Sequence, residues 1–149
     1  MHFGPIDLAT LYDLPAATVR AAGSGKAFVL LGEDGTPCKN PPETPQNAQT
    51  DTCGNRWGNR VKILHGNGYV SIYVHLEKVL IKDGDLVNQG DPIGIEGWTG
   101  YAGHRHLHWS LQKFQPETGR TLAQNRAIAF HLLSEQVILE MLKLLIRSH

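Results

Sequence analysis

The sequence has no excess of charge of either sign, because 14 lysines and arginines balance 14 aspartates and glutamates among 149 residues. Binding of nucleic acid as the main partner needs a basic face, so the balance argues against that class. No apolar run is long and uncharged enough to cross a bilayer, since the apolar C-terminal segment is broken by Glu135, Glu140, Lys143 and Arg147. We therefore expect one domain with a real core and no transmembrane segment.

Cysteine is also scarce. Cys38 and Cys53 both lie in a polar loop, residues 33–58, and they lack the C-x-x-C spacing of a zinc knuckle or a redox motif. So long a loop without internal structure is unusual in a compact domain. We expect a disulfide that closes it, which indicates an oxidising compartment. The alternative is two free thiols on a cytosolic loop.

A signal peptide is not visible either, because Met1 is followed at once by His2 and a turn-like Gly4-Pro5. If the protein is exported, its leader and further N-terminal sequence are expected upstream of this chain.

Glycine and proline are abundant, with 16 and 8 residues, and they predict many turns and short strands. Segment 27–31 is an apolar run typical of a buried strand. In segment 69–76, Tyr69, Ser71, Tyr73 and His75 share one face by alternation, which suggests a groove wall. The other segments expected to contain strands or turns are 2–8, 14–22, 59–64, 79–94 and 103–111.

Residues 59–64 alternate, with Val61 and Ile63 on one face, and the Asn67-Gly68 dipeptide that follows predicts a hairpin. Asp83, Asp85 and Asp91 are expected to be turn residues and not ligands.

The C-terminal part differs, because residues 121–146 contain neither glycine nor proline and are strongly apolar. This predicts a helix over 120–147 that packs on the sheet, dimerises or belongs to something outside this chain. The predicted fold is mainly β: a compact antiparallel sheet or sandwich over residues 1–115, with short strands and long loops, followed by the helix.

Eight histidines raise the expectation of a metal site, and His106-Leu107-His108 carries the strongest signal. In a strand His106 and His108 point the same way, and His104 shares their parity if the strand reaches back so far. Neutral imidazole is the commonest nitrogen ligand for zinc. The alternative is a row of exposed histidines on a solvated sheet face.

Asp7 stands oddly between Ile6 and Leu8, either as a ligand or as a turn-capping aspartate. Two histidines and one carboxylate are a common ligand set for a hydrolytic zinc, which leaves a fourth position for water. Zinc lowers the pKa of that water towards neutrality. Two further histidines would serve as general base and oxyanion stabiliser.

The sequence resembles the lysostaphin-type (LytM-like) zinc endopeptidases, which cut peptidoglycan peptides. The resemblance covers residues 2–111, about three quarters of the chain, and several motifs carry it in order. They are Asp7-Leu8-Ala9 after a His and a Gly, residues 58–68, Tyr73-Val74-His75-Leu76, residues 82–94, Gly97-Trp98-Thr99-Gly100 and His106-Leu107-His108-Trp109.

The resemblance implies a compact antiparallel β fold with a groove across the sheet, one zinc ion and a cell-wall peptide as substrate. It implies zinc ligation by His2, Asp7 and His108, and catalytic roles for His75 and His106. Tyr73, Trp98 and Tyr101 are groove-lining candidates, with packing as the equal alternative. An extracellular or periplasmic location follows, and activity should fall below about pH 6 as His75 and His106 protonate.

Three features depart from the family pattern. One extra residue separates His2 from Asp7, His104-Arg105 replaces the usual Gly-Pro, and the C-terminal helix is no usual part of the domain. His104 is therefore an alternative ligand or a residue of the groove rim.

Two other functions remain open. The first is an impaired member of the same fold that binds cell-wall peptide or activates another hydrolase. The second is a biotinyl or lipoyl carrier, which residues 79–94 resemble, although the Asn67-Gly68 hairpin tip lacks the lysine that such carriers modify.

Overall fold

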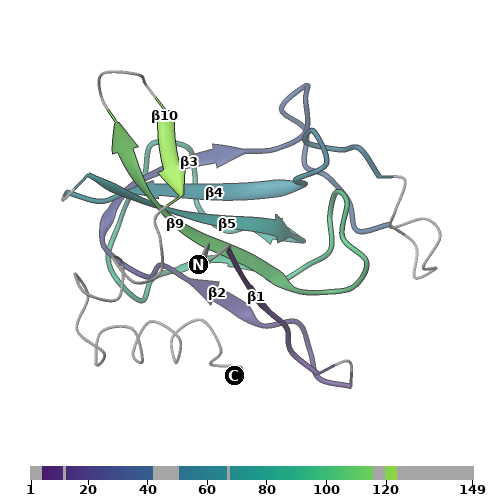
Figure 1. Cartoon of the computed structure of the whole chain (residues 1–149). Helices are drawn as coiled ribbons and strands as arrows, with labels where there is room; N and C mark the ends of the chain where they lie inside the picture. The colour runs from purple at the N-terminus through teal and green to yellow at the C-terminus, as the bar shows by residue number, and fades with distance from the viewer. Residues whose placement is uncertain (1–4, 12, 42–50, 67, 116–119, 124–149) are drawn as a thin grey trace.

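A computed structural model of the chain describes residues 5–11, 13–41, 51–66, 68–115 and 120–123 (Figure 1). The described residues form ten strands in two antiparallel sheets and no helix. The mainly β sandwich predicted from the sequence is thereby confirmed. The strands are β1 (Ile6–Leu8), β2 (Thr18–Arg20), β3 (Gly25–Leu30), β4 (Asn59–Leu64), β5 (Tyr69–Leu76), β6 (Lys78–Val79), β7 (Leu86–Val87), β8 (Pro92–Ile95), β9 (Leu107–Gln115) and β10 (Arg120–Ala123).

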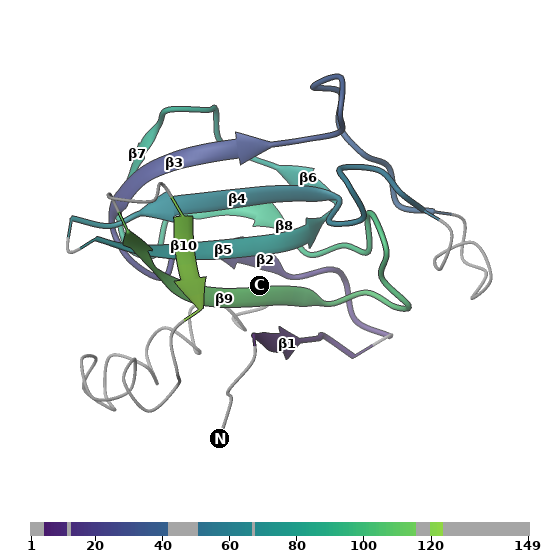
Figure 2. The same ribbon diagram turned by 45° about the horizontal axis from the view of Figure 1, so that its top comes forward.

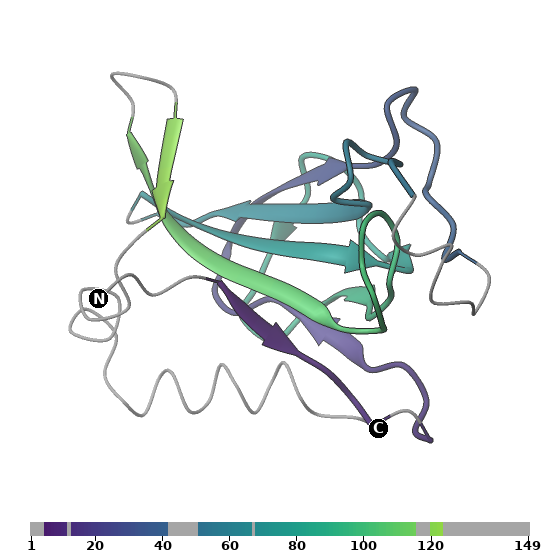
Figure 3. The same ribbon diagram turned by 45° about the vertical axis from the view of Figure 1, so that its right-hand side comes forward.

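The larger sheet has seven strands in the order β1-β9-β5-β4-β3-β7, and β10 pairs with the far half of β9. The smaller sheet has the order β2-β8-β6. Figure 2 shows the smaller sheet behind β4 and β5, and Figure 3 shows the hairpin of β9 and β10 projecting from one end of the larger sheet. The long strand β9 therefore carries β1, and with it Asp7, at the end opposite this hairpin.

The core lies between the two sheets. Val61 and Ile63 of β4 point into it and are fully buried, as the alternation predicted. They pack with Val19 of β2 and Ile93 of β8, also in the core cluster. Burial of these apolar surfaces is the main force that holds the sheets together.

We call the opposite side of the larger sheet the outer face. Arg60, Lys62 and Leu64 alternate with the core residues of β4 and so lie on this face. On β5 it carries a second cluster of Val70, Ile72 and Val74. Strand pairing continues the face through His108 on β9 to Asp7 on β1.

Two expectations about burial were wrong. In segment 27–31 only Ala27 is fully buried, and Phe28 remains 39% exposed because it faces outward near the edge of the sheet. Ser71 and Tyr73 form no groove wall, since both are fully buried. The Tyr73 hydroxyl accepts a 2.7 Å hydrogen bond from the Ala22 amide, which satisfies its polar end inside the core.

The C-terminal prediction is partly corrected. Residues 120–123, placed in the helix, instead form β10, because they pair in register with residues 112–115 of β9. The remainder of the predicted helix lies outside the described residues. Among those described, the structure contains no helix with the length and apolarity needed to cross a membrane.

The predicted disulfide is present between Cys38 and Cys53. The Asn59 side chain holds the same segment, because its amide oxygen accepts from the Cys38 amide and its nitrogen donates to the Cys38 carbonyl. The bridge thus ties the loop to the start of β4.

Replacing both cysteines by serine should lower the free energy of unfolding by about 3 kcal/mol, since the bridge closes a loop of 15 residues. Denaturant unfolding of both proteins, with and without a reductant, measures this loss. The reductant should destabilise the wild type and leave the double-serine variant unchanged. An equal response of the two proteins would contradict the expected contribution of the bridge.

Candidate functional site

Strand pairing brings Asp7 and His108 together from opposite ends of the sequence. Asp7 of β1 lies directly opposite His108 of β9, so both side chains share the outer face. Their Oδ1 and Nδ1 atoms are 2.7 Å apart, while the Asp7 side chain stays 62% exposed. The pair is therefore an accessible carboxylate and imidazole in direct contact.

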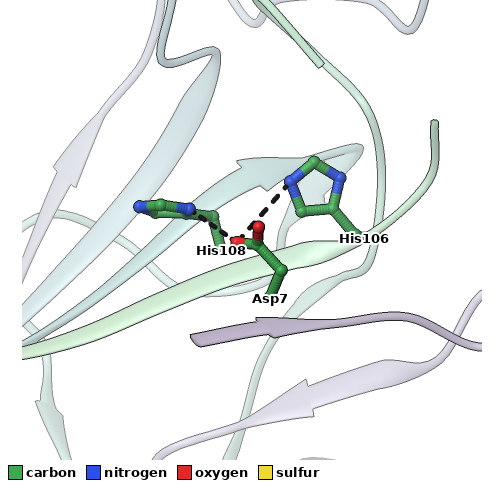
Figure 4. A group of neighbouring side chains, drawn as sticks. All are labelled: Asp7, His106 and His108. Carbon is green, nitrogen blue, oxygen red and sulfur yellow. Dashed lines mark hydrogen bonds and ion pairs between the residues drawn. The ribbon is translucent and has the colours of Figure 1, made fainter. Parts of the chain in front are cut away.

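His106 completes this cluster from just outside β9. An isolated bridge to Gly97 holds its backbone, and its Nε2 lies 3.9 Å from Asp7 Oδ1. Figure 4 shows the carboxylate of Asp7 between the rings of His106 and His108. One ligand atom from each of the three residues lies within 4.8 Å of the others.

His75 reaches the same site through an irregularity in β5. Strict alternation would point it into the core beside Tyr73, but its φ is +63°, a left-handed conformation rare outside glycine. The register between β4 and β5 shifts at this point, so Val74 and His75 together oppose Arg60. The His75 ring centroid consequently lies 5.0 Å from that of His106 and 6.0 Å from that of His108.

The hydrogen bonds of the three rings distinguish their roles. His75 Nδ1 lies 2.8 Å from the Thr99 carbonyl, and His106 Nδ1 lies 2.8 Å from the His104 carbonyl. A carbonyl only accepts, so in both rings Nδ1 carries the proton and the neutral ring keeps a free lone pair on Nε2. His108 differs, because its Nδ1 faces the Asp7 carboxylate.

The pKa of His75 is lowered to about 4, chiefly by burial and to a smaller extent by the neighbouring charges of His106 and His108. The hydrogen bond to Thr99 and the charge of Asp7 oppose this shift. His75 therefore stays neutral well below pH 6. The expectation that its protonation limits activity near pH 6 is wrong for this residue.

The two remaining histidines of interest are placed differently. His2 lies outside the described residues, so its proposed ligation stays a prediction. His104 is exposed, its ring centroid lies 4.9 Å from that of His106, and its carbonyl orients that ring. The group of potential metal ligands found among the described residues does not include His104.

Arg105, the second departure from the family pattern, ties the site together. Its guanidinium donates to the carbonyls of Leu11 and Leu14, at 2.9 and 2.7 Å, and lies 3.8 Å from the Glu96 carboxylate. Glu96 is buried and accepts from the amide and the hydroxyl of Thr10. These contacts join the loop after β1 to the segment before β9, and so connect the two parts that carry Asp7 and His108.

Sequence reasoning missed two neighbours of the histidines. Thr99 fixes the His75 ring, and its place in the Gly-Trp-Thr-Gly motif was the available signal. Gly58 lies against Thr99 at a φ of +64°, where any Cβ would collide. Trp57 is 44% exposed with its ring centroid 5.7 Å from that of His108, and no pattern in the sequence singled it out.

The groove-lining candidates have separate environments. Tyr73 belongs to the core. Tyr101 is 45% exposed, and the Arg56 guanidinium lies over its ring, with Cζ 4.2 Å from the ring centroid. Trp98 is partly buried, and its amide donates to the Asn40 side chain.

Comparison with known proteins places this arrangement in a family. Residues 13–124 match Peptidase family M23, three quarters of the chain. The chain belongs to this family. Asp7 precedes the matched residues, so its place in the site rests on the pairing of β1 with β9.

Curated relatives within the M23 family include the peptidoglycan DD-endopeptidase ShyA of Vibrio cholerae, 48% identical over 54 residues, which are 36% of this chain and 13% of ShyA. The cell division protein DipM of Caulobacter vibrioides is 30% identical over 118 residues, covering 64% of this chain and 19% of DipM. The chain thus spans well under two thirds of the length of these relatives.

Among solved structures, a zinc-containing peptidase from Vibrio cholerae is 28% identical, with a TM-score of 0.50 over 78% of this chain and 28% of that chain. The catalytic domain of lysostaphin from Staphylococcus simulans is 24% identical, with a TM-score of 0.55 over 88% and 80% of the two chains. Because only 24% of the residues are identical, the match to lysostaphin shows a shared fold and nothing more.

Proposed function

We propose that this protein is a zinc-dependent endopeptidase that hydrolyses the peptide cross-links of bacterial peptidoglycan in the cell envelope, outside the cytoplasm. The observation that carries the proposal is the cluster of Asp7, His106 and His108, with His75 beside it. Membership of the M23 family and the names of relatives such as ShyA support it. The disulfide agrees with an oxidising compartment.

The donor set suits zinc, because a carboxylate oxygen and an imidazole nitrogen are both common zinc ligands. Asp7 and His108 would hold the ion, with His2 as the third protein ligand. The Asp7 and His108 ligand atoms are 2.7 Å apart, so one ion could be held by both. When bound, zinc polarises the scissile carbonyl and lowers the pKa of a water molecule towards 7.

His75 and His106 supply the proton chemistry. Their backbone hydrogen bonds occupy Nδ1 and leave Nε2 of each ring as a free acceptor beside the cluster. His75, which stays neutral, would accept the proton of the attacking water on Nε2. His106 would donate a hydrogen bond to the developing oxyanion from Nε2 when that nitrogen carries a second proton taken from solvent. Trp57 borders the site beside His108 and offers an aromatic surface to the peptide.

The proposal is tested by zinc analysis of the purified protein together with the release of soluble peptides from isolated peptidoglycan. We expect about one zinc per chain, loss of cleavage with a chelator and recovery on adding zinc. Zinc without cleavage would favour the impaired member that binds wall peptide or activates another hydrolase. Protein that binds no zinc at all would refute the hydrolase.

A further inference from the structure

Arg60 stands on the outer face within reach of the histidine cluster. It lies on β4, and β5 separates β4 from β9, as Figure 2 shows. Neighbouring strands are about 4.8 Å apart, so the backbones of Arg60 and His108 are separated by about 10 Å. Arg60 also faces the bulge that turns His75 into the site.

The guanidinium of Arg60 is partly buried and has no counter-charge among the described residues. Its Nε is buried without a hydrogen-bond partner, and no ion pair among the described residues involves it. Burial lowers the pKa of Arg60, with no carboxylate acting against the shift. Arginine nevertheless stays protonated in proteins, so a desolvated positive charge remains.

The surrounding strands favour an anionic ligand. Lys62 lies two residues further along β4 on the same face, and Lys26 follows on β3 opposite Leu64. Asp7 is the sole acidic residue in the ten described strands, and it is already bonded to His108. A substrate crossing this face therefore meets unpaired positive charge beside the cluster.

We propose that Arg60 is a specificity-determining residue that binds a free carboxylate of the peptide substrate within about three residues of the scissile bond. The inference rests on the proposed function and deepens it. The planar guanidinium matches a carboxylate with two parallel hydrogen bonds, which a lysine cannot reproduce. Because Nε is buried, the ligand would bind through the other two guanidinium nitrogens.

This assignment selects between substrates that the sequence left open. A direct cross-link between stem peptides presents free carboxylates near the bond that is cut. An interpeptide glycine bridge is uncharged along its length and offers nothing to Arg60. The enzyme should therefore prefer peptides with a carboxylate close to the cleaved bond.

The test compares two synthetic cross-linked peptides that differ in one group, a free carboxylate or its carboxamide beside the scissile bond. We expect the wild-type kcat/KM to favour the carboxylate peptide by about 10- to 100-fold, as charge-assisted hydrogen bonds do. In Arg60→Gln this ratio should fall to about one, and in Arg60→Lys to an intermediate value. Lys78→Gln removes one positive charge from the smaller sheet and should keep the wild-type ratio.

Equal cleavage of the two peptides by the wild type would overturn the role of Arg60 while the hydrolase stands. An Arg60→Gln protein that keeps the preference would do the same, provided thermal unfolding shows it folded. If neither peptide is cleaved, equilibrium binding of the same pair decides. If the protein binds the carboxylate peptide more tightly and this preference depends on Arg60, the inference is upheld without the hydrolase. Equal binding of the two peptides would overturn both the role of Arg60 and the hydrolase.

Discussion

The His108→Ala variant is expected to lose its zinc and to hydrolyse peptide at least about 1,000-fold more slowly than the wild type. His108 places Nδ1 2.7 Å from the Asp7 carboxylate, so the substitution leaves that carboxylate without the imidazole with which it would hold the ion. The loss of zinc removes the group that makes water nucleophilic at neutral pH. Zinc content by elemental analysis and kcat/KM on cross-linked peptide measure the two effects.

His104→Ala is the matched control for this variant. The side chain of His104 is exposed, and the contact that orients His106 comes from its backbone carbonyl, which alanine keeps. The control should retain zinc and activity, whereas His2→Ala should lose zinc if His2 is the third ligand. Full zinc content in His108→Ala would contradict the proposed site, and zinc lost from His104→Ala would make His104 a ligand.

The His75→Asn variant is expected to keep its zinc while kcat falls by about 100- to 10,000-fold, the usual contribution of a general acid–base group. Asparagine tolerates the left-handed backbone that His75 adopts at a φ of +63°, so the bulge in β5 should survive. The variant therefore removes Nε2 without moving its neighbours. Zinc analysis and single-turnover kinetics separate this outcome from loss of the metal.

A second variant checks the backbone at His75. His75→Val should unfold at a lower temperature than His75→Asn, because a β-branched residue is strained in this conformation by about 1–3 kcal/mol. A kcat close to that of the wild type in His75→Asn would remove His75 from the proton chemistry and leave that role to His106.

The pH dependence of folding reports on the same ring. Well above pH 6.5 His75 is neutral in both the folded and the unfolded chain and contributes no pH dependence. As the pH falls from 6.5 to about 4, the unfolded chain binds the proton first, because the folded pKa is lowered to about 4. Stability should therefore drop by up to about 3 kcal/mol across this window, and His75→Asn should lack this part of the drop.

Much of the fold follows from local pattern. Alternation in residues 59–64 predicted which side chains of β4 enter the core, and the Asn-Gly dipeptide predicted the hairpin in which the Gly68 amide donates to the His65 carbonyl. The turn aspartates also behave as expected, since Asp85 and Asp91 accept from backbone amides three residues earlier. Such features depend on neighbours within a few residues, so the sequence alone specifies them.

Burial was harder to predict than strand position. Tyr73 and Ser71 look like groove residues because they are polar, yet both lie in the core. Their hydrogen-bonding groups find partners from distant segments, Ala22 for Tyr73 and His65 for Ser71. A polar side chain can be buried once it is paired, and the pairing depends on packing between segments.

The sequence by itself determined the β architecture, the closing of the polar loop by Cys38 and Cys53, and the shared face of His106 and His108. Only the tertiary structure decided that Asp7, 101 positions from His108, meets it across a strand pair. It also decided that a bulge turns His75 out of the core, and that Arg60, two strands from His108, buries its Nε without a hydrogen-bond partner. Alternation is a property of one strand, whereas register, bulges and the pairing of charges arise when strands distant in sequence are packed together.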